Sequence, residues 1–326
     1  MSKSKKRVLS GIQPSGKLHL GNYFGMMSRM INYQDKNDLF CFIVNYHALT
    51  SIQNKIELEQ NTINAALDFL ALGMDPNKST FWVQSDVPQV TELTWLLSSM
   101  AGVGLMERST SYKDKIDKGL SPHMGLFSYP ILMAADILLY GSEIVPVGKD
   151  QKQHLEITRD IAIRFNNTYG KDLLVIPNPD INKQTMLVPG TDGQKMSKSY
   201  GNTIPIFADE KLIKKSVMSI TTDSAGINEP KDKDTPLFKI YSLFLNSEEK
   251  NILIDRYDTP GLMYGDLKKE LTNRIIEHFS PYRQKRDYLL KNIDHVHRIL
   301  EIGKDKASEV ADKYIKKIRE AMGLHY

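Results

Sequence analysis

Two short segments carry residues suited to binding phosphate groups. The first, from Ser10 to Asn22, reads SGIQPSGKLHLGN, and the second, from Lys195 to Ser199, reads KMSKS. The first joins an expected strand to an expected helix, whose start directs free backbone N–H groups and a positive dipole end at an anion. The second holds two lysines in a glycine-bearing loop, which suits a mobile clamp on an anion. Taken singly, the first is equally a turn capped by Asn22, and the second a solvated basic loop.

The glycine spacing of the first segment excludes two common nucleotide-binding motifs. No Gly-Lys-Ser/Thr follows a glycine run, so the segment is not a Walker loop. Gly11, Gly16 and Gly21 also have the wrong spacing for the dinucleotide fingerprint. His19 and Asn22 add hydrogen-bonding side chains at the expected helix start. The two segments together are more specific than either alone, because one opens the strand–helix region and the other follows its end.

A third feature is an acidic residue inside an apolar stretch. The stretch from Ser128 to Tyr140 reads SYPILMAADILLY, which predicts a buried helix. Tyr129, Met133 and Asp136 are spaced four and three residues apart, so they share one helical face. Burying an unpaired carboxylate is costly, so Asp136 needs a donor. That donor is either a neighbouring element of the protein or a bound ligand, and the stretch alone leaves both open.

The elements that must position these residues alternate between strands and helices. The pattern predicts a parallel sheet with helices on both faces, a Rossmann-like doubly wound α/β fold. Gly148 follows one expected strand, and Asp150 could cap the next helix, at the strand end where such sheets bind ligands. The expected strands are 8–12, 39–44, 80–84 and 143–147, and the expected helices 20–33, 56–72, 90–100, 122–140 and 150–165.

The pattern changes to helices alone near residue 200. We therefore expect a catalytic domain over residues 1–205 and a helical domain over 206–326, with the last helix packing back on the first domain. The polar stretch 224–234 predicts a loop. The expected helices are 209–219, 235–246, 247–257, 260–281 and 283–323.

The bulk composition excludes several classes of protein. A 41% hydrophobic and 25% charged chain of 326 residues predicts a soluble globular protein. Cys41 is the only cysteine, which excludes an internal disulfide and a cysteine-rich metal site and favours a cytoplasmic setting. The sequence predicts neither a signal peptide nor a membrane span. The net charge of +4 is compatible with a polyanionic partner without establishing one.

The two phosphate-binding segments resemble the paired signatures of class I aminoacyl-tRNA synthetases. The family forms are His-Ile-Gly-His and Lys-Met-Ser-Lys-Ser; here they stand as HLGN, from His19 to Asn22, and KMSKS, from Lys195 to Ser199. The second is intact, whereas the first ends in Asn22 in place of histidine. The tryptophanyl branch is similar in both the GIQPSG lead and the Asn ending. The resemblance covers nearly the whole chain.

The resemblance implies a two-step reaction. ATP activates L-tryptophan to tryptophanyl-adenylate with release of pyrophosphate, and the amino acid then passes to the 3′ end of tRNA(Trp), releasing AMP. It also implies Mg²⁺ that accompanies ATP and is not held by protein ligands, an anticodon-binding role for the helical half, and a homodimer. Basic residues suited to RNA phosphates stand in that half at 211–215, 268–269, 283–286 and 313–317, although most such runs are solvated helix faces.

The residues that the resemblance assigns to ATP position and neutralise the phosphates. No general base is required, because the substrate carboxylate is already ionised at neutral pH. The residues implied for ATP binding are Gln13, Pro14, Ser15, His19, Gly21, Asn22, Gly148, Lys149, Asp150, Val188, Lys195, Met196, Ser197, Lys198 and Ser199. The residues implied for catalysis are Gln13, Lys115, Lys195, Ser197 and Lys198.

The resemblance also resolves the role of Asp136, which would accept the indole N–H of tryptophan. Indole has one donor on an apolar body, and phenylalanine in the same pocket would leave the acceptor unpaired, which such sites reject by about 10⁴–10⁵. Leu9 departs from the family, which often has an aromatic residue there. The full set implied for tryptophan is Leu9, His47, Tyr129, Met133, Asp136, Val145, Val147 and Gln151.

Three other functions fit parts of the sequence. A tyrosine-specific ligase would share the fold and the mechanism. A nucleotidyltransferase that adenylates a small metabolite would share the fold but would not need the helical half. An RNA-binding regulator without activity would not need Lys195 and Lys198.

Overall fold

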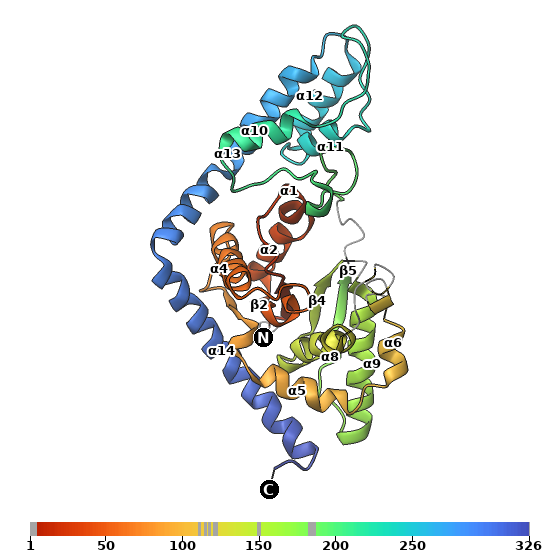
Figure 1. Ribbon diagram of the computed structural model, residues 1–326, viewed down its shortest axis with the longest axis vertical. Helices are drawn as coiled ribbons and strands as arrows, with labels where there is room; N and C mark the ends of the chain where they lie inside the picture. Colours follow the sequence, from red (N-terminus) through yellow and green to blue (C-terminus); the bar gives the residue numbers. More distant parts are fainter. Residues whose placement is uncertain are drawn as a thin grey trace.

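A five-stranded parallel sheet forms the centre of the protein (Figure 1). The computed structural model describes residues 5–109, 112–113, 116, 119, 123–148, 151–181 and 187–325. The sheet order is β3-β2-β1-β4-β5, and each neighbouring pair is parallel. The strands are β1 (Arg7–Ile12), β2 (Asp38–Ile43), β3 (Ser79–Val83), β4 (Ile144–Val147) and β5 (Asn178–Ile181).

The chain order reverses on the two sides of β1. Val8 pairs with Leu39 of β2 on one side and with Ile144 of β4 on the other. The crevice beyond the carboxyl ends of β1 and β4 is therefore the switch point where doubly wound sheets bind ligands. The predicted doubly wound fold is confirmed.

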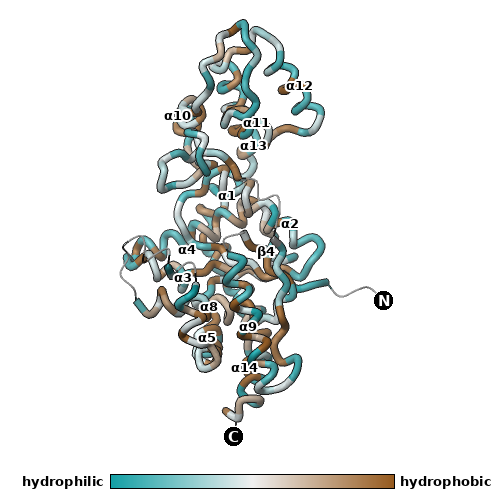
Figure 2. Tube along the Cα trace, turned by 90° about the vertical axis from the view of Figure 1, so that its right-hand side faces the viewer, coloured by the Kyte–Doolittle hydropathy of each residue, from teal (hydrophilic) through white to brown (hydrophobic). Residues whose placement is uncertain are grey.

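Helices cover both faces of the sheet and form two hydrophobic cores. Successive β1 residues alternate between them: Val8 packs into one core and Leu9 into the other. In Figure 2 the hydrophobic stretches run through the middle of the molecule around β4, whereas outer turns are hydrophilic. The first face is covered by α1 (Leu20–Asn22), the π turn η1 (Tyr23–Met27), α2 (Ser28–Lys36) and α4 (Lys55–Ala71); the second by α5 (Gln89–Ser98), α8 (Met124–Leu139) and α9 (Lys152–Tyr169).

The C-terminal helices extend the first core beyond the sheet. Leu271 and Phe279 belong to the same buried cluster as Val8. Arg286 also donates to Asp68 of α4 at 2.6 Å, which ties the two regions by a largely buried ion pair. The helices are α10 (Glu210–Met218), α11 (Pro236–Ser242), α12 (Ser247–Asp258), α13 (Tyr264–Lys291) and α14 (Ile293–Ala321).

The last helix returns along the side of the sheet (Figure 1). α14 packs against β3, with Ala307 and Ala311 fully buried. At Gly303 the two backbones come so close that an added Cβ would lie 1.8 Å from the Phe81 carbonyl oxygen. The division of the chain at residues 205 and 206 stays a prediction, since the helical region shares its core with the sheet.

Two element predictions were incomplete or wrong. β5 was not predicted; it has only four residues and contains Pro179, which is tolerated because β5 is an edge strand. The helix break predicted after residue 281 is wrong: α13 continues through Pro281 to Lys291, and the break is at Asn292. Burial of the flanking Phe279 and Leu289 sides of α13 offsets the backbone hydrogen bond that Pro281 removes. Within the described residues, no helix is long and apolar enough to cross a membrane.

Candidate active site

A cavity of about 450 Å³ opens at the carboxyl ends of β1 and β4. Its walls come from β1, β2, α8 and β4, and from the turns that follow the strands. Gln13 and Gly148, which were predicted for ATP, also line it. All eight residues predicted for tryptophan lie in this one cavity: Leu9, His47, Tyr129, Met133, Asp136, Val145, Val147 and Gln151.

Asp136 lies on the cavity wall and is held by two donors. His47 Nε2 lies 2.8 Å from Oδ2, and Gln84 Nε2 lies 2.8 and 2.9 Å from Oδ1 and Oδ2. Only 3% of Asp136 is exposed. Neighbouring elements of the protein supply its donors, which is one of the two possibilities that the sequence left open. The same carboxylate faces the cavity, so pairing within the protein leaves it available to a ligand.

The electrostatic state of Asp136 reflects opposing effects. Burial raises the pKa of its carboxyl above the usual value, and the hydrogen bonds and charge from His47, followed by the hydrogen bond from Gln84, lower it. Tyr140, also buried, has its pKa raised well above 10, first by burial and second by the Asp136 charge. The Tyr140 phenol is therefore neutral at neutral pH and adds no charge beside Asp136.

Tyr129 and Gln151 line the same cavity. The Tyr129 hydroxyl is hydrogen-bonded to His154 Nε2, and His154 is completely buried in α9. The Tyr129 ring also meets His47 edge-on, with 6.1 Å between ring centroids. α8 therefore directs Tyr129, Met133 and Asp136 into one cavity, as their helical spacing predicted.

The first phosphate-binding segment forms the turn between β1 and α1. Its tight path is closed by Ser15 N–H donating to the Gln13 carbonyl at 2.8 Å and by Gly16 at φ +78°. Asn22 Oδ1 accepts from His19 N–H at 3.1 Å, so Asn22 caps the helix start. The sequence left open whether Asn22 caps the helix or contacts a ligand, and this geometry is compatible with both roles.

His19 is buried beside this turn. Burial and, second, the charge of Lys198 lower its pKa to about 4, so the imidazole is neutral at neutral pH. Its Nδ1 is buried and has no hydrogen-bond partner among the described residues. An orphaned polar atom here fits a site that a polar ligand completes.

The second phosphate-binding segment lies in a loop organised by a buried asparagine. Asn202 Oδ1 accepts from Ser197 N–H at 2.8 Å, and its amide donates to Asp192 at 2.7 Å and to the Lys195 carbonyl at 3.2 Å. Gly190 allows this approach, since a Cβ there would lie 2.2 Å from the Asn202 amide nitrogen. Met196 N–H donates to the Val188 carbonyl at 3.0 Å, which places Val188 behind the loop.

The structure brings the two segments into contact. Gly21 N–H points at Met196 Sδ, 3.3 Å away, and Lys198 Nζ donates to the Ser15 carbonyl. Burial lowers the pKa of Lys198, while the charge of Asp68 opposes that effect. Lys198 thus lies against the turn that also borders the amino-acid cavity, and Lys195 precedes it by three residues in the same loop. This arrangement can neutralise a polyphosphate next to an enclosed amino acid.

Some predicted residues lie outside the described part of the chain, and some lining residues were not predicted. Lys115, Lys149 and Asp150 belong to the first group, so their placement stays a prediction. Most of the residues that were not predicted lie on or just after the strands, and Met26 lies in the π turn. For those near strand ends, their position at the carboxyl end of a predicted strand was the available signal. The residues that were not predicted are Ser10, Met26, Phe42, Val44, Thr50, Ile137 and Pro146 in the cavity, Gln84 behind Asp136, and Asn202 within the phosphate-binding loop.

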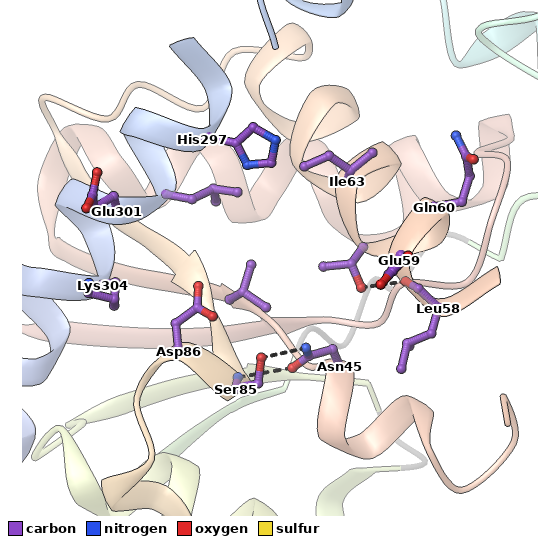
Figure 3. Close-up of a pocket in the computed structure, with 13 residues that line it drawn as sticks. Asn45, Leu58, Glu59, Gln60, Ile63, Ser85, Asp86, His297, Glu301 and Lys304 are labelled. Carbon is purple, nitrogen blue, oxygen red and sulfur yellow. Dashed lines mark hydrogen bonds between the residues drawn. The ribbon is translucent and has the colours of Figure 1, made fainter. Parts of the chain in front are cut away.

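A larger cavity of about 870 Å³ lies between α4, β3 and α14 (Figure 3). Three carboxylates line it, from Glu59, Asp86 and Glu301, against the cations of Lys304 and, when protonated, His297. It contains no residue predicted for ATP or tryptophan. A predominantly acidic lining repels a triphosphate, so the smaller cavity at the switch point is the candidate site. Within the described residues, no group of three or more His, Cys, Asp or Glu side chains could hold a metal ion.

Comparison with known proteins places this geometry in a family context. Residues 1–280 match the family model described as tRNA synthetases class I (W and Y). The chain is 54% identical over 319 residues to the tryptophan–tRNA ligase of Fusobacterium nucleatum, covering 98% of both chains. It is 50% identical over 319 residues to that of Campylobacter jejuni, covering 98% of this chain and 100% of the other.

Solved structures agree with these relatives. Tryptophanyl-tRNA synthetase from Campylobacter jejuni, complexed with ADP and tryptophan, matches with a TM-score of 0.93 at 50% identity, over 97% of this chain and 99% of that one. The enzyme from Mycoplasma pneumoniae matches with a TM-score of 0.81 at 30% identity, covering 98% of each. A tyrosyl-tRNA synthetase from Archaeoglobus fulgidus shares the fold, with a TM-score of 0.65 at 18% identity, over 87% of this chain and 91% of the other.

Proposed function

Because the chain belongs to the class I tRNA synthetases for tryptophan and tyrosine, we propose that it is a tryptophan–tRNA ligase. It uses ATP to convert L-tryptophan into tryptophanyl-adenylate and transfers the tryptophanyl group to tRNA(Trp). The observation that carries the amino-acid assignment is Asp136, a buried acceptor on the wall of an otherwise largely apolar cavity. Tryptophan offers one matching donor on a large apolar ring.

The site supports a division of labour between cavity and loop. The apolar side chains of Met133, Val145 and Val147 enclose the indole, and Asp136 accepts its N–H. Tyr129 and Gln151, which line the same cavity, hold the amino group. The substrate carboxylate then points toward the turn that holds Gln13, where the α-phosphate of ATP would lie.

In the first step the carboxylate attacks the α-phosphate and pyrophosphate leaves. Lys195 and Lys198 neutralise the charge that builds up on the β- and γ-phosphates, next to the turn that Lys198 contacts at Ser15. Mg²⁺ shares this charge when bound to the phosphates. In the second step a 3′-terminal hydroxyl of the RNA attacks the acyl carbonyl, and AMP leaves.

ATP–pyrophosphate exchange measured with each of the twenty amino acids tests the assignment. Tryptophan alone should support exchange well above background, and tRNA(Trp) should then be charged. Exchange that depends on tyrosine and ignores tryptophan would establish the tyrosine ligase. Exchange without charging of any RNA would establish the small-metabolite nucleotidyltransferase, and absence of exchange the inactive RNA-binding regulator.

The helical region and an apolar surface support the remaining assignments. α10 to α13 form the region assigned to the anticodon. A homodimer is supported by exposed apolar side chains around a cavity of about 420 Å³ between α3 (Asn45–Ala48), α5 and α8: Leu49 lines it, and Trp95 (77% exposed) and Met124 (73% exposed) adjoin lining residues. The cytoplasmic setting also stays a prediction.

Sedimentation tests the dimer. Trp95→Glu should shift the chain from dimer to monomer, because a charge in a buried interface has no partner there. Ile252→Glu, at an exposed apolar residue on α12, is the matched control and should leave the dimer intact. A wild-type chain that sediments as a monomer would remove the dimer from the proposal.

A further inference from the structure

Gln84 carries a buried side-chain amide that contacts the carboxylate of Asp136 from behind. It is 1% exposed and stands at the start of η2 (Gln84–Asp86), directly after β3. Its Nε2 lies within 2.9 Å of both oxygens of Asp136. No role for it was expected from the sequence, and it does not line the cavity.

The orientation of the Gln84 amide is fixed by the backbone. Its Oε1 accepts from Tyr46 N–H at 3.0 Å, so the other end of the amide, Nε2, must face Asp136. Because Nε2 is only a donor, this arrangement favours Asp136 as a carboxylate, which accepts, over the protonated acid, which donates. The direction of the hydrogen bond is thereby set by a residue that never contacts the ligand.

The donors around Asp136 also leave its two oxygens unequal. Oδ2 accepts from both His47 and Gln84, whereas Oδ1 accepts from Gln84 alone among the described residues. Each carboxylate oxygen has two lone pairs, so Oδ1 retains one for a further donor. An indole N–H requires one such acceptor.

We propose that Gln84 is a positioning residue for amino-acid selection, which holds Asp136 as an ionised acceptor with Oδ1 directed to the substrate. The inference rests on the proposed function of the cavity. It predicts that loss of the Gln84 donor weakens the binding of tryptophan. The binding of ATP should be unaffected, because other loops form its site. It also predicts a new pH dependence, because Asp136 loses one of the groups that keep it ionised.

The groups that face Asp136 define what the pH profile reports. His47 from α3 and Tyr140 from the end of α8 are the titratable neighbours. Tyr129 lies about two turns earlier on α8 and is bonded to His154 of α9. All four are unchanged when Gln84 is replaced. The wild-type profile therefore serves as the reference for their titration.

The experiment measures pyrophosphate exchange by Gln84→Met between pH 6 and pH 8.5. The KM for tryptophan should rise by about tenfold to a hundredfold, the loss expected when one hydrogen bond to a charged group is removed. The KM for ATP should stay within about threefold of wild type. The tryptophan KM should increase further as the pH falls, because a protonated Asp136 accepts poorly, while the wild-type profile should remain flatter.

Two further variants distinguish a positioning role of Gln84 from a role that only stabilises the contact between α3 and η2. Gln84→Glu keeps an acceptor for Tyr46 N–H but removes the donor, and should also raise the tryptophan KM. Ser85→Ala is the matched control: Ser85 joins Asn45 of α3 by two hydrogen bonds of 2.8 and 3.1 Å without touching Asp136 (Figure 3). It loosens the same contact between α3 and η2, and should leave the tryptophan KM and its pH profile unchanged.

A double-mutant cycle with Asp136→Asn decides the matter. If Gln84 acts through Asp136, adding Gln84→Met to Asp136→Asn should change the tryptophan KM much less than it does in the wild type. Equal losses in both backgrounds, equal losses for tryptophan and ATP, or a Ser85→Ala effect of the same size would overturn the inference. Wild-type exchange that does not depend on tryptophan would instead overturn the proposed function.

Discussion

The amino-acid cavity and the phosphate-binding loop are built in opposite ways. The cavity takes many of its residues from strands and from α8, and its acceptor Asp136 is buried, as is Gln84, which contacts Asp136 from behind. The loop from Pro189 to Asn202 is largely exposed, and its lysines stand at the surface of a short, glycine-bearing turn. Regular elements fix a shape precisely, whereas a loop can follow charge that develops during a reaction.

This difference assigns selection to the cavity and rate to the loop. A pocket that discriminates by one hydrogen bond must be rigid, because displacement of the acceptor would admit other side chains. A clamp on phosphates gains most from contacts that strengthen in the transition state. Changes in the two regions should therefore affect different kinetic constants.

The largest effect is expected from the loop. Lys195→Ala should lower the rate of activation by about 10²–10³, since it removes a charge that stabilises the leaving phosphates. The affinity for tryptophan should change far less, because Lys195 does not line the cavity. Single-turnover adenylate formation measures both, and Lys211→Ala on α10 is the matched control. An unchanged rate would exclude Lys195 from the chemistry.

The next effect is expected from the cavity. Asp136→Ala should reduce kcat/KM for tryptophan by about a hundredfold, because the buried acceptor is lost and its two donors are left unpaired. Affinity for ATP should change much less. Pyrophosphate exchange at varied concentrations of each substrate measures the two losses. Losses of equal size for both substrates would show that Asp136 is structural and would remove the contrast between the regions.

His19, which lies beside the turn between the two regions, should make the stability of the protein depend on pH. Its pKa is about 4 in the folded state against 6.5 in an ordinary imidazole, so the unfolded chain binds the proton first as the pH falls. Protonation of His19 therefore leaves the free energy of unfolding unchanged above about pH 6.5. It lowers that free energy by roughly 2–3 kcal/mol as the pH falls toward 4.

Urea unfolding of the wild type and His19→Gln at pH 7 and pH 4.5 measures this contribution. The wild type should lose more stability between the two pH values than the variant does. If both lose the same amount, His19 does not carry the effect.

The smallest effect concerns how the loop is held. Asn202→Ala removes the side chain that accepts from Ser197 N–H and donates to Asp192 and Lys195. We expect about a tenfold lower rate of activation with little change in tryptophan affinity, because the lysines are less well placed. Faster proteolysis within 189–202 should accompany it. A tryptophan-specific loss instead would contradict the separation of the two regions.

The sequence predicted best what depends on periodicity. The spacing of Tyr129, Met133 and Asp136 placed them on one helical face, and the alternation of strands and helices gave the sheet. Family resemblance supplied the remaining members of the cavity set, all of which the fold brings together. Their roles as ligand contacts remain predictions.

What the sequence did not predict depends on contacts between distant segments. Gln84 lies behind Asp136 only because β3 and α8 approach each other across the fold, and no local pattern marks it. Asn202 follows a glycine like many turn residues, yet it organises the whole loop. The path of α13 through Pro281 was hidden because local propensity favours a break where tertiary packing maintains the helix.

The close approach of α14 to β3 has a consequence for solubility. β3 is at one end of the sheet, where a strand would otherwise present unpaired backbone groups to another chain. Contact at Gly303 covers that border with a helix, while Pro179 interrupts the opposite border in β5. A chain that ended before residue 293 would expose β3 as a template for intermolecular pairing, so the last helix protects the folded protein from aggregation.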